Sequence, residues 1–366
     1  LCVIIFAFLL AGILSQELRQ SGLIQGLTWL VMKLGLSAGF LPLVAFLVCL
    51  LISTACGTSN GAIVAVLPVL LPVAATVGAN PSVVVGAIVS GAIFGDNLAP
   101  ISDTTIAACN GQGCAMKDKF RENFHIAFPA ALASLALILV LTLHADVTPA
   151  EIPPYNLIQI IPYVLVLIGG IIGINVFVVL LIGIVSGAVI ALATGATGQT
   201  GILAVKALLE NMGSGAAGMF ETSMVAILVS AICALIREYG GFEALLGFIR
   251  RIFHGNKGGQ LGIGLLVGLM DIATANNTVA IVMAGPIAKE VAEEYGISPK
   301  RSASLLDTFS CIFQGIIPYG AQMLMAAGLG HVSPIEIMQY LYYPYLLGAG
   351  ALLAILFNYP RKYTLV

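Results

Sequence analysis

Long apolar stretches, interrupted at polar points, run along nearly the whole chain. Six of them are candidates for single membrane-spanning helices, since a bilayer crossing takes about 20 apolar residues. They are Leu1–Leu18, Ala127–Leu143, Asn156–Gly170, Asn175–Ala193, Met219–Ile236 and Ile335–Phe357. This pattern predicts an all-α polytopic membrane protein.

The remaining apolar stretches come in pairs, each split by a short polar break. The pairs are Leu43–Ala55 with Ala62–Val77, Ser82–Phe94 with Ile101–Asn110, Ile263–Ile272 with Val279–Ala292, and Ser302–Phe313 with Tyr319–Leu329. An open backbone survives in hydrocarbon only where it lines a cavity or packs in protein. We therefore expect two re-entrant hairpins, from the first and third pairs, and two broken transmembrane helices, from the others.

The chain repeats itself at a shift of 218 residues. Gly22 falls on Gly240, Pro68 on Pro286, Gly78 on Gly296, Pro81 on Pro299 and Pro100 on Pro318. Two hydrophobic units with matched breaks are typical of secondary transporters, whose site lies where the broken helices meet. The pattern predicts a first repeat over 1–145, a linking transmembrane pair with an interfacial helix over 146–218, and a second repeat over 219–366.

The two repeats are predicted to be inverted, because five crossings separate the two copies of the first helix. The same topology distributes the basic residues unevenly. Twelve fall on one side: Lys117, Lys119, Arg121, Arg237, Arg250, Arg251, Lys257, Lys289, Lys300, Arg301, Arg361 and Lys362. Only Arg19, Lys33 and Lys206 fall on the other. By the positive-inside rule the first side is cytoplasmic, which predicts an inner-membrane protein with a cytoplasmic C-terminus.

Three segments are amphipathic: Gly22–Leu36, Phe242–Phe253 and Ile202–Met212. Helices of this kind lie in the membrane interface. The first two are repeat mates, so they are expected to be hinge arms beside the hairpins. Ordinary surface connectors are the alternative.

Composition supports the membrane assignment and narrows the function. Apolar residues make up 59% of the chain and charged residues 9%, against about 25% charged in soluble domains. The net charge of -2 argues against nucleic acid as a partner. The seven cysteines show neither zinc nor redox spacing. The chain begins at Leu1 inside an apolar run that lacks a basic start, so we expect the natural protein to extend before it rather than to begin with a signal peptide.

Four acidic residues lie at membrane depth, where a charge is costly and usually functional. They are Asp96, Asp103, Asp271 and Asp307, and their repeat mates are uncharged. The duplicated scaffold therefore carries asymmetric chemistry, as a coupled transporter requires. The alternative is a structural carboxylate bonded to helix ends or hydroxyl groups, which applies more to Asp103 and Asp307 than to the other two.

Small oxygen-bearing side chains surround these carboxylates. The candidate binding residues are Thr58, Ser59, Asn60, Asn97, Thr274, Asn276, Asn277 and Gln314, together with carbonyl groups freed at Asp96–Pro100 and Gln314–Pro318. Hard cations prefer such ligands, and half-helix C-termini add partial negative charge. We expect a sodium ion held by Asp96, Asp271, Thr58 and Asn277. Helix capping is a role that these side chains can also fill.

Phe94–Thr105, which reads FGDNLAPISDTT, resembles the GD-x-x-SP-x-SDT signature of NhaC-type sodium/proton antiporters in the ion transporter superfamily. Asp271–Gln322 looks like the second-half counterpart. The chain departs from the signature at Ala99, where the family usually has Ser. The resemblance implies a transport fold of hairpins and broken helices, often dimeric. It does not fix the cargo, because relatives include carriers of amino acids and organic acids.

The first functional hypothesis is sodium/proton antiport, with the two ions competing for overlapping carboxylates; removal from water favours the protonated form of a carboxyl group. No basic residue is expected at membrane depth to hold a carboxylate substrate. Coupled transport of an amino acid or small organic acid is the alternative, since half-helix N-termini alone can bind a carboxylate.

A passive channel is disfavoured. An intramembrane aspartyl protease is too, because Ile93 stands where that enzyme needs Gly. No enzyme activity and no cofactor are expected beyond the transported Na⁺ and H⁺.

Overall fold

The computed structural model describes residues 2–20, 38–99, 102–143, 156–172, 174–240 and 254–360, and the elements in these ranges are helices. The first half contains α1 Cys2–Gln20, η1 Ala38–Phe40, α3 Leu41–Cys56, α4 Ser59–Thr76, α5 Pro81–Leu98, α6 Asp103–Gln112 and α7 Met116–Leu143. The middle contains η2 Leu157–Ile160, α8 Ile161–Ile172, α9 Val176–Thr194 and α10 Ile202–Gly218. The second half contains α11 Phe220–Glu238, α13 Gly255–Thr274, α14 Asn277–Glu294, α15 Pro299–Ile316, α16 Ala321–Gly330, α17 Pro334–Met338 and α18 Tyr342–Leu356.

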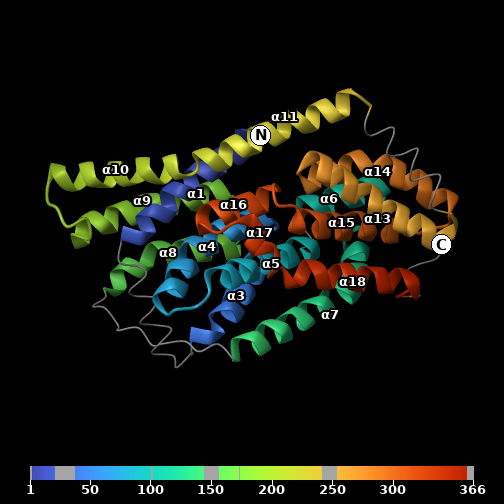
Figure 1. The fold of residues 1–366 in the computed structure, drawn as a ribbon, viewed down its shortest axis with the longest axis horizontal. Coiled ribbons are helices and arrows are strands. Elements are labelled where there is room, and N and C mark those ends of the chain that lie inside the picture. Colours follow the sequence, from blue (N-terminus) through green and yellow to red (C-terminus); the bar gives the residue numbers. More distant parts are fainter. Residues whose placement is uncertain are drawn as a thin grey trace.

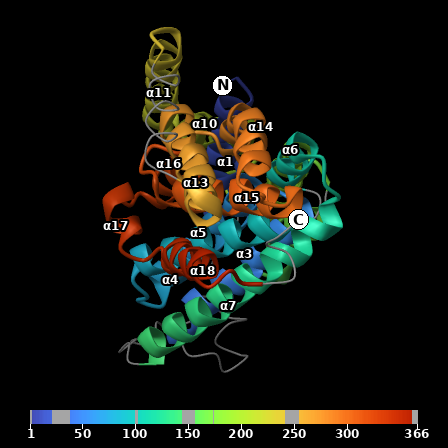
Figure 2. The same cartoon turned by 90° about the vertical axis from the view of Figure 1, so that its right-hand side faces the viewer.

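Helices α5 and α15 form the centre of the molecule. They contact each other, and α5 also contacts α3, α4, α7 and α18. Helices α8, α9 and α10 lie at one end, and α13, α14 and α18 lie at the other (Figure 1). In the view turned by 90°, α7 runs along the outside of the bundle next to α18 (Figure 2). The two central helices are therefore shielded by protein along most of their length.

The described elements are helices and several are long and apolar enough to cross a membrane, which is consistent with the predicted all-α polytopic membrane protein. Within the described ranges five segments meet this criterion. They are Ser59–Thr76, Pro81–Gln112, Met116–Thr142, Phe177–Thr194 and Pro299–Gly330. The second and fifth contain an interruption between two helices, after Leu98 and after Ile316.

Helix bounds recur at the 218-residue shift. The pairs are α1 with α11, α4 with α14, α5 with α15 and α6 with α16, and both bounds differ by 218 in each. Packing recurs as well: Gly91 of α5 lies against Phe46 of α3, and the corresponding positions in α15 and α13 are Phe309 and Gly264, whose ring and backbone also meet. These matches support duplication of the fold, while the orientation of the repeats and their outer bounds stay predictions.

The contact between α3 and α5 depends on Gly91. A Cβ atom at this position would collide with the main-chain carbonyl of Phe46, which no rotamer change can relieve. We expect Gly91→Ala to lower the free energy of unfolding by about 1–3 kcal/mol, measured by thermal unfolding of the purified protein in detergent. Gly285→Ala is the matched control, because a Cβ atom there meets open space. Equal stability of the two variants would contradict the close packing.

Two predicted helix bounds require correction, and two of the three predicted amphipathic segments lie outside the residues that the structure describes. The expected single span Ile335–Phe357 is two helices, α17 and α18, because Pro344 can neither donate to the carbonyl of Tyr340 nor fit beneath it in a continuous helix. Helix α7 begins at Met116 instead of Ala127, because two charged residues in its added turns, Lys119 and Glu122, are buried with partners in the protein. The amphipathic segment Ile202–Met212 belongs to α10. Its companions Gly22–Leu36 and Phe242–Phe253 lie outside the described residues.

Candidate functional site

The candidate site lies around four interruptions, each of which separates one helix from the next. Gly57 and Thr58 separate α3 from α4, and Ala275 and Asn276 separate α13 from α14. We call these two points the first tip and the second tip. Gly57 and Ala275 both adopt left-handed backbone angles, with φ of 69° and 51°, which end the preceding helices. The other two interruptions separate α5 from α6 and α15 from α16.

Asp96 lies two residues before the end of α5 and is 5% exposed. The hydroxyl of Ser59, at the first tip, donates to Asp96 Oδ2 at 2.8 Å. Asp96 also interacts electrostatically with the nearby side chains of Asp307 and Lys119. The structure thus brings a predicted carboxylate together with a predicted tip residue in a buried, charged environment.

A chain of hydrogen bonds continues from Ser59 to the second tip. Gln322 Nε2 donates to Ser59 Oγ at 3.0 Å, and Gln314 Nε2 donates to Gln322 Oε1 at 2.6 Å. Gln314 Nε2 also donates to the carbonyl of Ala275 at 3.3 Å. We call the five residues Asp96, Ser59, Gln322, Gln314 and Ala275 the relay. It joins all four interruptions through polar groups buried in the protein.

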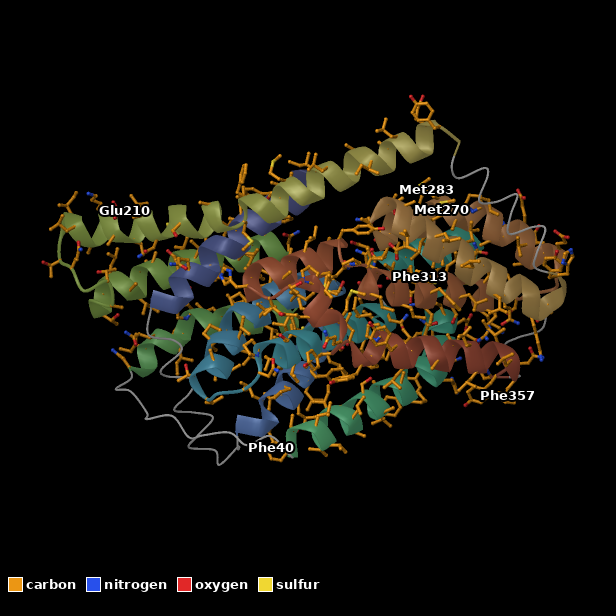
Figure 3. The ribbon with its side chains drawn as sticks, viewed as in Figure 1. Phe40, Glu210, Met270, Met283, Phe313 and Phe357 are labelled. Carbon is orange, nitrogen blue, oxygen red and sulfur yellow. The ribbon has the colours of Figure 1, made fainter. Side chains whose placement is uncertain are left out.

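Asp271 lies in the last turn of α13, beside the second tip. It is 0% exposed, and neither carboxylate oxygen has a hydrogen-bond partner within the part of the chain that the structure describes. The main chain of Gln314 lies near this carboxyl group but does not form a hydrogen bond with it. Neighbouring Met270 and the α15 residue Phe313 mark this region in Figure 3. A buried carboxylate without partners is costly unless it binds a proton or a cation.

Asp307 occupies a different environment, although it also lies in a central helix. Its Oδ2 accepts from Lys119 Nζ at 2.6 Å, from Asn97 Nδ2 at 2.9 Å and from Asn123 Nδ2 at 3.0 Å. The hydroxyl of Ser304 in turn donates to Asn123 Oδ1. This arrangement favours the structural alternative for Asp307, a carboxylate neutralised by protein groups.

Lys119 also contacts residues on both sides of the interruption between α5 and α6. Its Nζ donates to the carbonyl of Asn97 at 2.9 Å and to Thr105 Oγ1 at 2.7 Å, and Thr105 Oγ1 donates to the carbonyl of Ala99 at 2.9 Å. We expected the carbonyl groups freed at Asp96–Pro100 to face a sodium ion. Two of them instead accept hydrogen bonds from protein side chains.

The remaining predicted residues lie at the tips and at the start of α6. Thr58 occupies the N-cap position of α4, but its side chain makes no capping hydrogen bond there. Asn276 Oδ1 caps α14 through Val279 N–H, and Thr274 Oγ1 donates to the carbonyls of Met270 and Asn276. Asn277 Oδ1 accepts from Thr278 N–H. Among the described atoms Asn60 Oδ1 has no hydrogen-bond donor, and the same holds for Gln314 Oε1.

Asp103 stands apart from these groups. It is exposed at the first position of α6, next to the capping residue Ser102. Its role there is that of an acidic residue near a helix N-terminus, worth about 0.3–1 kcal/mol. We expect Asp103→Asn to change cation-driven proton flux in proteoliposomes by less than about threefold. If Asp103→Asn lost as much flux as an Asp271 variant, Asp103 would have to be counted among the residues of the site.

Three site residues were missed by the sequence interpretation: Lys119, Asn123 and Gln322. Lys119 was counted only as a basic residue of the predicted cytoplasmic side, and the structure shows that it is 1% exposed. Arg301 is likewise buried, paired with Glu122 at 2.7 Å. Two basic residues of the predicted cytoplasmic side are therefore buried and paired with acidic groups. One available signal was the four-residue spacing of Lys119 and Asn123, which places both on one helix face.

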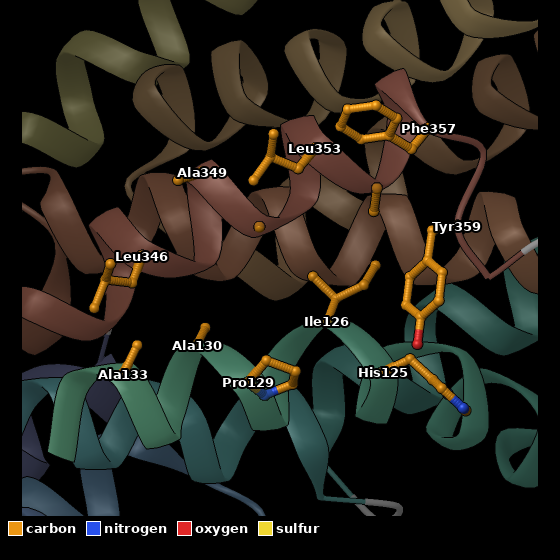
Figure 4. A pocket seen from close by; sticks show the side chains of 12 residues that line it. His125, Ile126, Pro129, Ala130, Ala133, Leu346, Ala349, Leu353, Phe357 and Tyr359 are labelled. Carbon is orange, nitrogen blue, oxygen red and sulfur yellow. The ribbon is translucent and has the colours of Figure 1, made fainter. Parts of the chain in front are cut away.

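A large groove lies elsewhere, between α7 and α18 (Figure 4). It measures about 520 Å³ and is lined mainly by apolar side chains, among them Ile126, Ala130, Leu346 and Leu353. None of its lining residues is a carboxylate. The groove therefore lacks the chemistry of a cation site and is separate from the relay.

Comparisons with known proteins identify a consistent set of relatives. The profile of the Na+/H+ antiporter family matches residues 1–146 and 141–359. Na(+)/H(+) antiporter NhaC of Bacillus subtilis is 24% identical over 98% of this chain and 84% of its own length, and NhaC of Alkalihalophilus pseudofirmus is 21% identical over 97% and 81%. An uncharacterized Na(+)/H(+) antiporter of Haemophilus influenzae is 26% identical over 76% of this chain, which spans 66% of that protein. The predicted resemblance to NhaC-type antiporters is confirmed.

Proposed function

Because the chain belongs to the Na+/H+ antiporter family, and is thus a membrane transporter and not an enzyme, we propose that it exchanges sodium ions for protons by alternating access. The family membership supports cation/proton antiport as the reaction class. The residues that bind the ions and the movements that expose them are inferred from the site.

One observation carries the proposal most directly: buried acceptor oxygens that lack donors lie beside the two tips and near the end of α15. These are both oxygens of Asp271, Asn60 Oδ1 and Gln314 Oε1, as judged within the described residues. An oxygen acceptor without a donor is expensive in a dry interior, and a hard cation satisfies several at once. A proton on the carboxyl group relieves the same cost. Sodium and proton therefore compete for one place.

We assign the sodium ion to the space between Asp96 and Asp271, with Thr58 and Asn277 as neighbouring ligands. The contact of Ser59 with Asp96 fits this role, because a hydroxyl group can donate to a carboxylate and still offer a lone pair to a cation. The oxygen of Asn277 already accepts one main-chain hydrogen bond and retains a second acceptor site. Protonation of either carboxylate would weaken sodium binding.

Transport of an amino acid or organic acid is the less favoured alternative. A carboxylate substrate would bind a half-helix N-terminus or a buried cationic side chain, and Lys119 is a buried basic group beside the site. All three of its N–H donors are used, by Asp307, Asn97 and Thr105. Lys119 is therefore committed to the protein, which supports ion exchange over solute binding.

The geometry of transport remains part of the proposal. We propose that α3–α4 and α13–α14 are re-entrant hairpins, and that α5–α6 and α15–α16 are broken transmembrane helices. We further propose that the repeats 1–145 and 219–366 are inverted about the linker 146–218. The C-terminus is then cytoplasmic in the inner membrane, and the working unit is a homodimer. The recurrent helix bounds support the repeats, and labelling of single cysteines from either side of the membrane tests the topology.

The decisive experiment is a flux assay with purified protein in proteoliposomes. An inward sodium gradient should drive protons outward without any organic solute, and a pH dye trapped in the lumen should report the resulting alkalinisation. A panel of amino acids and organic acids is varied separately from sodium and pH. Strict dependence of proton movement on one of these solutes would replace antiport with coupled solute transport.

A further inference from the structure

The relay has a fixed direction. The carbonyl of Ala275 can only accept, so the group of Gln314 that faces it must be the amide nitrogen. The other hydrogen on that nitrogen then points to Gln322 Oε1. Because one side of the Gln322 amide is fixed as an acceptor, its nitrogen must face Ser59. The single proton of the Ser59 hydroxyl is thereby directed at Asp96.

We propose that Gln322 is a positioning residue that couples the two tips through this directed relay. It touches neither carboxylate. It holds the Ser59 hydroxyl as a donor toward Asp96, and it holds the Gln314 amide against the carbonyl of the second tip. Displacement of the second tip would withdraw the Ala275 carbonyl, free both amides to turn, and release Ser59 from its orientation toward Asp96.

The packing around the relay supports this role. Gln322 is 2% exposed and is the second residue of α16, so its side chain reaches the site from a helix that also contacts α4 and α15. Gly320 leaves room for the Gln314 amide, because a Cβ atom there would lie 2.9 Å from Gln314 Nε2. The two amides are thus held in a narrow space with one satisfied orientation.

The first test measures the communication between the tips by hydrogen–deuterium exchange. Gln322→Met preserves side-chain length and removes both hydrogen bonds. We expect main-chain amides at the second tip, including Ala275 N–H and Val279 N–H, to exchange about fivefold faster in this variant. Ser59→Ala, which removes one oxygen at the first tip, should also accelerate exchange at the second tip. This smaller change tests the same coupling if Gln322→Met does not fold.

The matched control is Gln112→Met. Gln112 is also a buried glutamine, and its Nε2 donates to the main-chain carbonyl of Gly285 at 2.8 Å, away from the relay. Exchange at the second tip should stay at the wild-type rate in this variant. Unchanged exchange at the second tip in both Gln322→Met and Ser59→Ala overturns the proposal.

The second test rests on the proposed sodium/proton exchange. We expect Gln322→Met to raise the KM for sodium about tenfold with kcat within about twofold. A Ser59→Ala/Gln322→Met double variant should raise the KM by less than the product of the two single effects, because both residues act through one relay. Additive effects overturn the relay while leaving antiport intact. If the wild type moves no protons in response to sodium but hydrogen–deuterium exchange shows the coupling between the tips, the antiport proposal fails and the relay stands.

Discussion

Asp271→Asn is expected to reduce sodium-driven proton exchange severely while the protein remains folded. The substitution keeps the shape of the side chain and removes the charge that a cation or proton requires. Loss of one charged partner from a buried pair costs about 2–5 kcal/mol, so the rate at a fixed sodium concentration should fall about a hundredfold. The measurement is proton flux in proteoliposomes loaded with equal amounts of folded protein.

Stability separates this prediction from a simple folding defect. Neither oxygen of Asp271 has a hydrogen-bond partner in the described structure, so an unpaired ionised form is destabilising and a neutral amide should be tolerated. We expect the unfolding temperature of Asp271→Asn to equal or exceed that of the wild type in sodium-free buffer. Sodium should stabilise the wild type and leave the variant unchanged. The exposed Asp103→Asn serves as the control that keeps both exchange and sodium stabilisation.

Wild-type flux in Asp271→Asn would remove this residue from the site. Loss of flux together with a lower unfolding temperature would instead indicate a structural role, as for Asp307. The same assay applies to Asp96→Asn, for which we also expect loss of exchange, since Asp96 shares the relay with the second tip.

The helices and their interruptions were predictable because lipid imposes strong local rules. Pro81 and Pro299 begin α5 and α15, where a missing N–H is harmless. The polar runs at 56–60 and 273–278 coincide with both tips, since unpaired backbone is tolerated only within protein. The break before α18 was missed because Pro344 follows a tract rich in apolar and aromatic residues, which hydropathy alone reads as continuous.

The carboxylates of the candidate site could be selected from the sequence, but their partners could not. A carboxylate in an apolar tract is conspicuous in any sequence, so Asp96, Asp271 and Asp307 could be selected at once. Their different environments depend on which side chain arrives from another helix. Lys119 lies in a charged run that resembles a surface loop, and only the packing of α7 against α15 shows that it neutralises Asp307.

Lys119→Met is expected to destabilise the protein strongly. It leaves Asp307 buried without its cationic partner, and it leaves the Asn97 carbonyl with one donor fewer. Removal of one member of a buried ion pair costs about 3–5 kcal/mol. We therefore expect a clear fall in the unfolding temperature of the purified protein in detergent, and Lys117→Met, at an exposed position two residues away, provides the matched control.

The double variant Lys119→Met/Asp307→Asn decides between structural and transport roles for this pair. With both charges gone, no counter-ion is needed at either position, and the amides of Asn97 and Asn123 can still donate to the oxygen of the substituted side chain. We expect most of the lost stability to return, because the cost lies in the unpaired charge. Recovery of sodium-driven exchange along with stability would identify the pair as structural, with the two charges neutralising each other beside the interruption between α5 and α6. Recovered stability without exchange would instead make Lys119 or Asp307 a participant in transport, since the fold would then be intact and only the charges missing.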